Sequence, residues 1–184
     1  MADMKRKGYG QVEPNHLSAQ YTGQIYAQLP ARTANAAIPQ LENGQFLKYN
    51  YQADRASTDG DGEWLLVFNE VKLYDERRQR YKDFAMHASD MTDGQIYPRL
   101  LKTNIGDIFT TNTFKSTDDT PVTVSGPDEE ITMPELAKGN YLAIDAQGWL
   151  TKASTKPASG IVFQVVKVYN LGDMQDAVKI QRIQ

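Results

Sequence analysis

The chain of 184 residues contains no cysteine, which excludes disulfide bonds, thiolate metal sites and a cysteine nucleophile. It contains two histidines, His16 and His87. They lie far apart in the sequence, and we interpret both as polar surface residues rather than catalytic groups. No apolar run is long enough for a transmembrane helix, and the first seven residues lead into no hydrophobic signal segment. We therefore expect a soluble protein that makes no membrane contact and carries no visible export segment.

Established catalytic motifs are also missing from the sequence. There is no G-x-S-x-G nucleophile elbow, no G-x-x-x-x-G-K phosphate loop and no H-E-x-x-H zinc motif. Gly8 and Gly10 lack the third glycine and the preceding strand that a dinucleotide site requires. The sequence therefore predicts no catalytic residue, no cofactor and no bound metal, and we expect a protein that is not an enzyme.

The chain also lacks a basic surplus. Its net charge is −3 and its isoelectric point is near 5.4, whereas proteins that bind nucleic acids or anionic membranes normally carry an excess of lysine and arginine. Residues 5–7 form one compact basic cluster, but three charges give too weak an attraction for a nucleic-acid site. Nucleic acid is therefore not an expected partner.

One acidic loop leaves a metal alternative open. Asp59, Asp61 and Glu63 alternate with glycines, and carboxylate oxygens on a flexible loop are suitable calcium ligands. The spacing does not match an EF-hand loop, so a solvated turn is the favoured interpretation.

The clearest pattern in the chain is a β-meander near its C-terminus. Residues 141–144 form a short apolar run, residues 145–148 have turn composition, and Trp149 resumes the extended pattern, which predicts a hairpin. Residues 161–169 are dense in β-branched and aromatic residues and predict a central strand. Residues 177–183 predict a terminal strand. The expected fold class is all-β, with small barrel or sandwich lobes.

An earlier part of the chain repeats this pattern. Residues 44–50 parallel residues 139–145 with an offset of 139 − 44 = 95, and residues 68–74 parallel residues 163–169 with the same offset of 163 − 68 = 95. Two blocks in one register favour an internal duplication, although ordinary strand composition explains the same likeness. The strands expected in this earlier part are residues 46–51, 64–74 and 81–88.

The first 42 residues differ in composition from the rest. Small and polar residues dominate, and Pro14, Pro30 and Pro39 favour extended backbone in the residues before them. The segment is too short to bury an interior of its own, yet it carries more apolar side chains than a solvated linker. We therefore predict an extended N-terminal arm over residues 1–42 that binds a partner surface. The residues predicted to make this contact are Leu17, Tyr21, Ile25, Tyr26, Leu29 and Ile38.

Two other interpretations of this segment stay open. Leu17, Tyr21, Ile25 and Leu29 recur at every fourth residue, which is typical of one face of a helix, although Gly23 weakens that helix. Alternatively, the segment folds back over its own body as an edge strand.

The remaining chain divides into two predicted lobes. Turn composition at residues 90–94 separates a first β lobe, residues 43–95, from a second, barrel-like lobe, residues 96–184. In the second lobe Ile108 and Phe109 follow a turn and predict a strand, and Pro134 favours one helical turn over residues 134–137.

Residues 24–31, 42–46 and 139–150 together resemble virion structural proteins of tailed bacteriophages, particularly small head decoration or auxiliary capsid proteins. The resemblance implies a β-barrel protein without enzymatic activity that sits on a capsid and forms a homo-oligomer in the assembly. Its implied partners are the major capsid protein or other virion proteins, and its implied location is the virion, assembled in the host cytoplasm. An arm that adds strands to neighbouring sheets would supply the contacts, and the symmetry of the shell would multiply them.

Two further functions stay open. Trp64, Trp149 and the tyrosines have side chains that stack on sugar rings, which favours a carbohydrate- or receptor-binding β-module of a phage tail or attachment apparatus. A hydrolase with paired carboxylates such as Asp59 and Asp61 is the third hypothesis.

Overall fold

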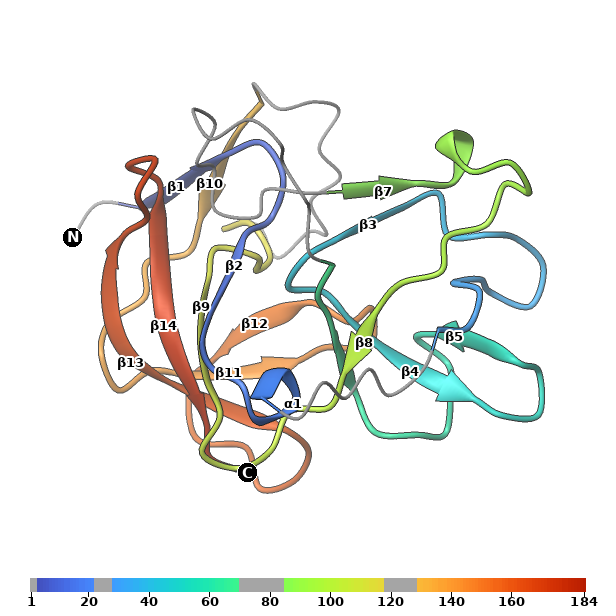
Figure 1. Cartoon of the computed structure of the whole chain (residues 1–184). Helices are drawn as coiled ribbons and strands as arrows, with labels where there is room; N and C mark the ends of the chain where they lie inside the picture. The colour runs from blue at the N-terminus through green and yellow to red at the C-terminus, as the bar shows by residue number, and fades with distance from the viewer. Residues whose placement is uncertain (1–2, 22–27, 70–84, 118–128) are drawn as a thin grey trace.

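The computed structural model describes residues 3–21, 28–69, 85–117 and 129–184. Over these residues the chain forms four antiparallel sheets (Figure 1), which confirms the all-β prediction. The elements in chain order are β1 (Met4–Lys7), β2 (Val12–His16), α1 (Ser18–Tyr21), β3 (Gln40–Glu42), β4 (Phe46–Asn50), β5 (Arg55–Ser57), β6 (Leu65–Val67), β7 (Ala85–His87), η1 (Ala88–Asp90), β8 (Leu100–Leu101), β9 (Ile108–Thr111), β10 (Glu130–Met133), β11 (Tyr141–Ile144), β12 (Leu150–Ala153), β13 (Val162–Asn170) and β14 (Asp176–Arg182).

The largest sheet has six strands in the order β12-β11-β13-β14-β9-β2. β11 and β12 form the predicted hairpin, in which Ile144 lies opposite Leu150. β13 lies between β11 and β14, as its β-branched and aromatic composition predicts. β14 is the predicted terminal strand, and β9 is the strand predicted to begin at Ile108.

A second sheet has four strands in the order β5-β4-β6-β8. This order matches β12-β11-β13-β14 in the larger sheet. In each case a strand (β4 or β11) has its hairpin partner (β5 or β12) on one side and two later strands of the chain on the other side. The register is not preserved, because Phe46 pairs with Leu66, whereas residue 141 pairs with residue 164 and not with 66 + 95 = 161. The shared order agrees with the duplication hypothesis at the level of topology.

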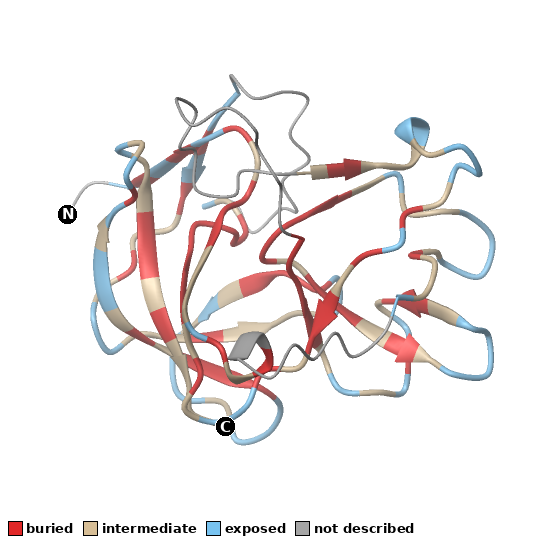
Figure 2. Ribbon diagram, viewed as in Figure 1, coloured by how far each residue is buried: buried red, intermediate tan, exposed pale blue. Residues whose placement is uncertain are grey.

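Two apolar clusters form the core. The larger cluster lies against the six-stranded sheet and includes Phe46, Leu66, Phe109 and Phe163. The smaller one includes Leu47, Leu65 and other residues on the far side of the four-stranded sheet. Neighbouring residues of β4 and β6 thus enter different clusters, so both faces of this sheet are buried, and for that reason β6 is apolar throughout. Figure 2 shows the buried positions gathered between the two large sheets.

This packing is sandwich-like. Within the residues that the structure describes, neither large sheet closes into a barrel, so of the two predicted forms, barrel or sandwich, the sandwich holds. The larger cluster contains Met4, Leu66 and Phe163, so one core spans the predicted arm and both predicted lobes. Gly148 adds a backbone link, since Phe46 donates its N–H to the Gly148 carbonyl at 2.8 Å.

The described part of residues 1–42 is not an extended arm. β1 pairs with β10, and β2 is the edge strand of the six-stranded sheet beside β9. The hairpin tip between β13 and β14 holds this segment as well, because Asp176 and Gln175 accept hydrogen bonds from the backbone N–H groups of Lys5 and Lys7 at 2.8 and 2.7 Å. The alternative in which the segment folds back on its own body therefore describes these residues. The segment carries apolar side chains because they complete the chain's own core.

A buried ion pair fixes the same segment from inside. Arg6 Nη2 lies 2.9 Å from Glu42 Oε2, and the two side chains are 0% and 2% exposed. The same oxygen accepts the N–H of Gly10 at 2.7 Å, and Gln40 Nε2 donates to the other carboxylate oxygen at 3.1 Å. Such a pair is tolerated in a core only because further hydrogen bonds satisfy the carboxylate.

Three smaller predictions have different outcomes. The helical turn over residues 134–137 is wrong, because the chain there has no helical structure. The strand predicted over residues 64–74 is shorter, since β6 ends at Val67, and residues 70–84 lie outside the described part of the chain. The strand predicted over residues 81–88 is represented by β7.

Candidate functional site

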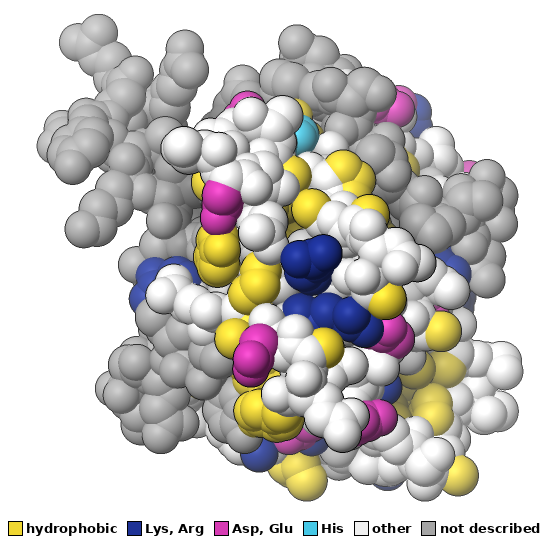
Figure 3. All heavy atoms as spheres, turned by 90° about the vertical axis from the view of Figure 1, so that its right-hand side faces the viewer, with side chains coloured by type: hydrophobic (Ala, Val, Ile, Leu, Met, Phe, Trp, Pro, Cys, Tyr) yellow, Lys and Arg dark blue, Asp and Glu magenta, His cyan; other side chains and the backbone are white. Residues whose placement is uncertain are grey.

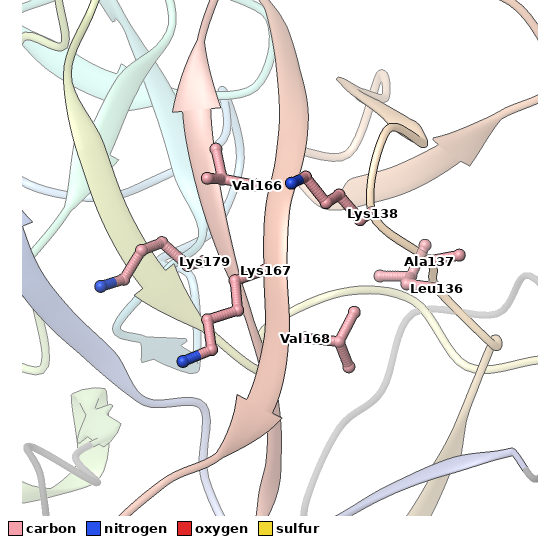
Figure 4. A pocket seen from close by; sticks show the side chains of 7 residues that line it. All are labelled: Leu136, Ala137, Lys138, Val166, Lys167, Val168 and Lys179. Atoms are coloured by element: carbon pink, nitrogen blue, oxygen red, sulfur yellow. The ribbon is translucent and has the colours of Figure 1, made fainter.

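An open hollow in the described structure lies beside β13. It has a volume of about 560 Å³ and lies between β13 and the loop that leads into β11 (Figure 4). Its apolar part consists of Leu136, Ala137, Val166 and Val168. Val168 is 39% exposed, which is unusual for a valine in the longest strand of a sheet. We call this hollow the β13 groove.

Three lysines surround the β13 groove: Lys138, Lys167 and Lys179. Figure 4 shows Lys167 and Lys179 on one side of β13, with Val168 and Leu136 on the other and Lys138 reaching towards the strand from its loop. Among the residues that the structure describes, none of the three ammonium groups is paired with a carboxylate. The groove is therefore an apolar surface with a positively charged rim.

The two strand lysines lie directly opposite each other. In the antiparallel register Lys167 is the partner of Lys179, and like charges in that position repel. Both ammonium groups lie near the ring of Tyr169, at 5.3 and 5.6 Å from its centroid. The negative face of the ring offsets part of this repulsion. A bound anion would offset more of the repulsion between the two lysines.

The neighbouring strands extend this polar row. Lys179 lies opposite Thr110, and Thr110 lies opposite Glu13. The Tyr169 hydroxyl donates a hydrogen bond to Glu13 Oε2 at 3.0 Å and lies 2.6 Å from the Thr110 hydroxyl. Burial, together with the hydrogen bond to Glu13, raises the pKa of Tyr169 above its ordinary value of 10.0. Tyr169 therefore stays protonated at neutral pH and serves as a hydrogen-bond donor, not as a base or nucleophile.

A second, smaller hollow lies at the other lobe. It has a volume of about 90 Å³ and is lined by Tyr49, Tyr51, Glu63 and Lys102, among others. Tyr51 is 68% exposed, and its ring lies 5.4 Å from that of Tyr49. Figure 3 shows the face of the molecule at this end, where basic side chains gather among apolar and acidic ones.

Glu63 joins this lobe to the C-terminal strand. Its carboxylate lies 2.8 Å from Arg182 and 3.1 Å from Lys102. Burial alone would raise the pKa of Glu63, but the hydrogen bonds and charges of Arg182 and Lys102 outweigh it, and the pKa is lowered. Glu63 is thus a structural anion at this position.

The acidic glycine loop is arranged as a structural turn. Asp59 accepts hydrogen bonds from the Ser57 hydroxyl and from Arg55. The Ser57 hydrogen bond lowers the pKa of Asp59, with the Arg55 charge acting in the same direction. A nearby guanidinium repels a calcium ion. Among the described residues no three carboxylate or histidine side chains are grouped to hold a metal ion, and no described helix is long and apolar enough to cross a membrane.

The structure places the predicted partner-binding residues in three different settings. Leu17 is 1% exposed and belongs to the larger core cluster, so it packs within its own chain and offers no surface to a partner. Leu29 and Ile38 are half-buried against the smaller cluster. The side chain of Tyr21 and the whole of Ile25 and Tyr26 lie outside the described residues.

The two tryptophans and His87 are likewise packed against other side chains. Trp149 is 6% exposed, so its ring is not available to stack on a sugar. Trp64 packs against the core with the Lys48 ammonium 4.6 Å from its ring centroid. His87 contacts the Tyr9 ring edge to face at 5.8 Å, and His16 is exposed at the end of β2.

The β13 groove was hardly predictable from the sequence. Lys167 and Lys179 belong to different predicted strands, and only the register of β13 against β14 brings them together. The sequence held one indication of the groove. Lys167 is a charged residue within a strand that is otherwise apolar enough to be predicted as a central, buried strand, and Val168 follows it directly. Comparisons of the chain with protein-family models, with curated proteins and with solved structures found no match. The geometry of the groove is therefore the basis of the proposed function.

Proposed function

We propose that this chain is a structural protein without enzymatic activity that binds neighbouring protein subunits, and that its setting is a virion, as a capsid decoration or auxiliary head protein. The observation that carries the proposal is the β13 groove, in which exposed Val168 and the apolar side chains beside it are bordered by three lysines that form no ion pair with a described carboxylate. Apolar side chains that gather at a surface hollow with a polar rim can form part of an interaction site. The likeness of the sequence to tailed-phage decoration proteins supplies the setting.

The mode of contact differs from the one expected for an arm. Residues 4–17 contribute β1, β2 and Leu17 to the chain's own sheets and core. Contacts to neighbouring subunits are therefore assigned to the outer face and free edge of the six-stranded sheet. Repetition of one modest contact around a symmetric shell is sufficient for firm attachment, because the contacts act together.

The polar residues near the groove support binding rather than catalysis. Glu13, Thr110 and Tyr169 bind one another, and Tyr169 keeps its proton at neutral pH. The three lysines present positive charge, and none of them is paired with a carboxylate base among the residues that the structure describes. This arrangement suits recognition of a negatively charged partner surface.

The test is attachment to particles. Particles are purified on a density gradient from the cells whose genome encodes the chain, and fractions are probed with an antibody raised against the isolated protein. We expect the protein to co-sediment with capsids in many copies per particle. A protein found entirely among the free soluble proteins, with intact particles that lack it, would refute the proposal.

The carbohydrate- or receptor-binding module is a second proposal, and one observation favours it at a new position. Tyr51 is 68% exposed beside the smaller hollow, and exposed tyrosine rings are of a type that stacks on sugar rings. Binding on a glycan array that the Tyr51→Ala variant loses while it keeps its fold would support this module. No binding to any glycan would reject it.

A further inference from the structure

β13 has a free edge on the side of the groove. The strand runs from Val162 to Asn170, but β11 pairs with only its first three residues. The last backbone hydrogen bonds on this side join Val165 to Gly139 and Asn140, both at 2.8 Å. Beyond them the chain of residues 136–138 diverges from β13, and within the described structure no strand pairs with residues 166–170 on this side. The β13 groove occupies the space that opens between them.

A bulge directs the side chains at this edge. The register of β13 against β14 shifts between Val165 and Lys167, and such a shift re-aims the residues that follow it. Lys167 and Val168 are consequently both exposed, one on each side of the strand (Figure 4). An extended chain laid along this edge would therefore have Lys167 and Lys179 towards one of its faces, and Val168, Leu136 and Lys138 towards the other.

The lysines determine which kind of extended segment can bind at the edge of β13. Lysines and bulges commonly protect a strand edge from pairing with other chains, but protection needs neither an apolar groove nor two lysines placed opposite each other. The repulsion between Lys167 and Lys179 destabilises the isolated protein, and features that lower stability concentrate at functional sites. A partner with carboxylates in register would remove this repulsion, whereas a neutral or basic strand would not.

We propose that the free edge of β13 accepts an extended segment of a partner protein in which acidic and apolar residues alternate. The inference rests on the proposed function, since the partner is a neighbouring subunit. Side chains alternate between the two faces of a strand, so the acidic residues would face Lys167 and Lys179 while the apolar residues fill the space beside Leu136 and Val168. The backbone of the added strand supplies affinity, and its two faces supply specificity.

The experiment measures binding of a fluorescently labelled peptide of alternating glutamate and valine by anisotropy. Two peptides serve as controls: one of the same composition with its glutamates and valines in separate blocks, and one of alternating lysine and valine. The variants are Lys167→Glu and Lys179→Glu. The matched control is Lys156→Glu, which makes the same charge change at an exposed loop lysine away from the groove.

We expect the alternating acidic peptide to bind the wild type and the Lys156→Glu variant equally. Binding should weaken about tenfold or more in either groove variant, and it should weaken as salt is raised. Lys167→Glu should not lower the melting temperature, because its new charge lies opposite Lys179, so the loss of binding cannot come from unfolding. The block peptide and the basic peptide should bind weakly or not at all.

Three results of the binding measurements would overturn the inference. One is equal peptide binding by Lys167→Glu and Lys156→Glu, and another is equal binding of the block and alternating peptides. The third is binding to phosphatidylglycerol vesicles that Lys167→Glu abolishes while no peptide binds, which would assign the groove to an anionic membrane. Particle attachment separates this inference from the proposed function. If Lys167→Glu attaches to particles as well as the wild type does, the edge site is wrong and the function stands; if the wild type does not attach, the function itself fails.

Discussion

Replacement of Leu17 by alanine tests whether the opening segment is part of the folded body in the isolated protein. Leu17 is 1% exposed within the larger core cluster. Removal of its three outer carbons forfeits about 0.8 kcal/mol for each buried carbon, or about 2.4 kcal/mol. The cavity left behind adds to this, so we expect a loss of about 2.5–4 kcal/mol in the free energy of unfolding.

The assay is equilibrium unfolding in urea, followed by tryptophan fluorescence on the isolated protein at low concentration. A loss of about 3 kcal/mol would lower the urea midpoint by about 1–3 M. The control is Ile105→Ala, because Ile105 is 72% exposed and its truncation should change stability by less than about 0.5 kcal/mol. If Leu17→Ala changes stability no more than this control does, the segment is not held by its own chain and the argument from burial is refuted.

Four further predictions concern single contacts. Glu42→Ala should destabilise the protein by about 3–5 kcal/mol in urea unfolding, because it removes the buried carboxylate that pairs with Arg6. Glu130→Ala, which removes the exposed pair with Lys5, should change nothing measurable, and equal effects of the two substitutions would contradict this assignment. Gly148→Ala should lower the melting temperature more than Gly139→Ala does. Both glycines have a positive φ, which alone costs about 1–2 kcal/mol for alanine, but only at Gly148 would the added Cβ lie 2.1 Å from the Phe46 carbonyl oxygen. Equal losses in the two variants would show that this close contact is absent. The pKa of Glu63 is lowered in the folded protein, so its contribution to stability is present above about pH 4.5 and is lost as the pH falls through the folded pKa. Glu63→Gln should therefore make the stability of the protein less dependent on pH in this acidic range. An unchanged pH dependence would show that Arg182 and Lys102 do not stabilise the Glu63 carboxylate. Lys167→Glu should stabilise the isolated protein by about 0.2–1 kcal/mol by placing opposite charges across β13 and β14, and a measured destabilisation would show that the two lysines do not repel.

The strands with a strong local pattern were predictable from the sequence. The hairpin of β11 and β12 is set by a turn at residues 145–148, and Asp145 closes that turn by accepting the N–H groups of Gln147 and Trp149 at 2.9 Å. β13 is dense in β-branched residues, β14 alternates apolar and polar residues around Val178 and Ile180, and both strands formed where the sequence predicted them. Local turn chemistry and strand propensity decide such elements, and both can be read from neighbouring residues.

The position of the opening segment was not predictable in the same way. Its strands are held by contacts with residues more than a hundred positions away, such as Lys5 with Asp176 and Gln11 with Asp173. Its composition is polar because many of its side chains and backbone groups bind other parts of the chain, and polar composition is also what an arm would show. Only the tertiary structure separates the two cases.

The groove was missed for a related reason. Its parts come from the loop before β11, from β13 and from β14, and the bulge after Val165 determines which of their side chains meet. A shift of register by one residue would turn Lys167 and Val168 to the opposite faces. The sequence carries no direct mark of this register, so the charge and shape of the site followed only from the structure.

Amide hydrogen exchange of the protein, free in solution and attached to its particle, tests the central claim most directly. An added strand forms backbone hydrogen bonds along the edge of β13, so we predict that residues 166–170 exchange more slowly in the attached protein, while residues 4–17 are already protected in the free protein. Unchanged exchange at residues 166–170, with new protection confined to residues 4–17, would contradict the account and restore the N-terminal arm as the contact.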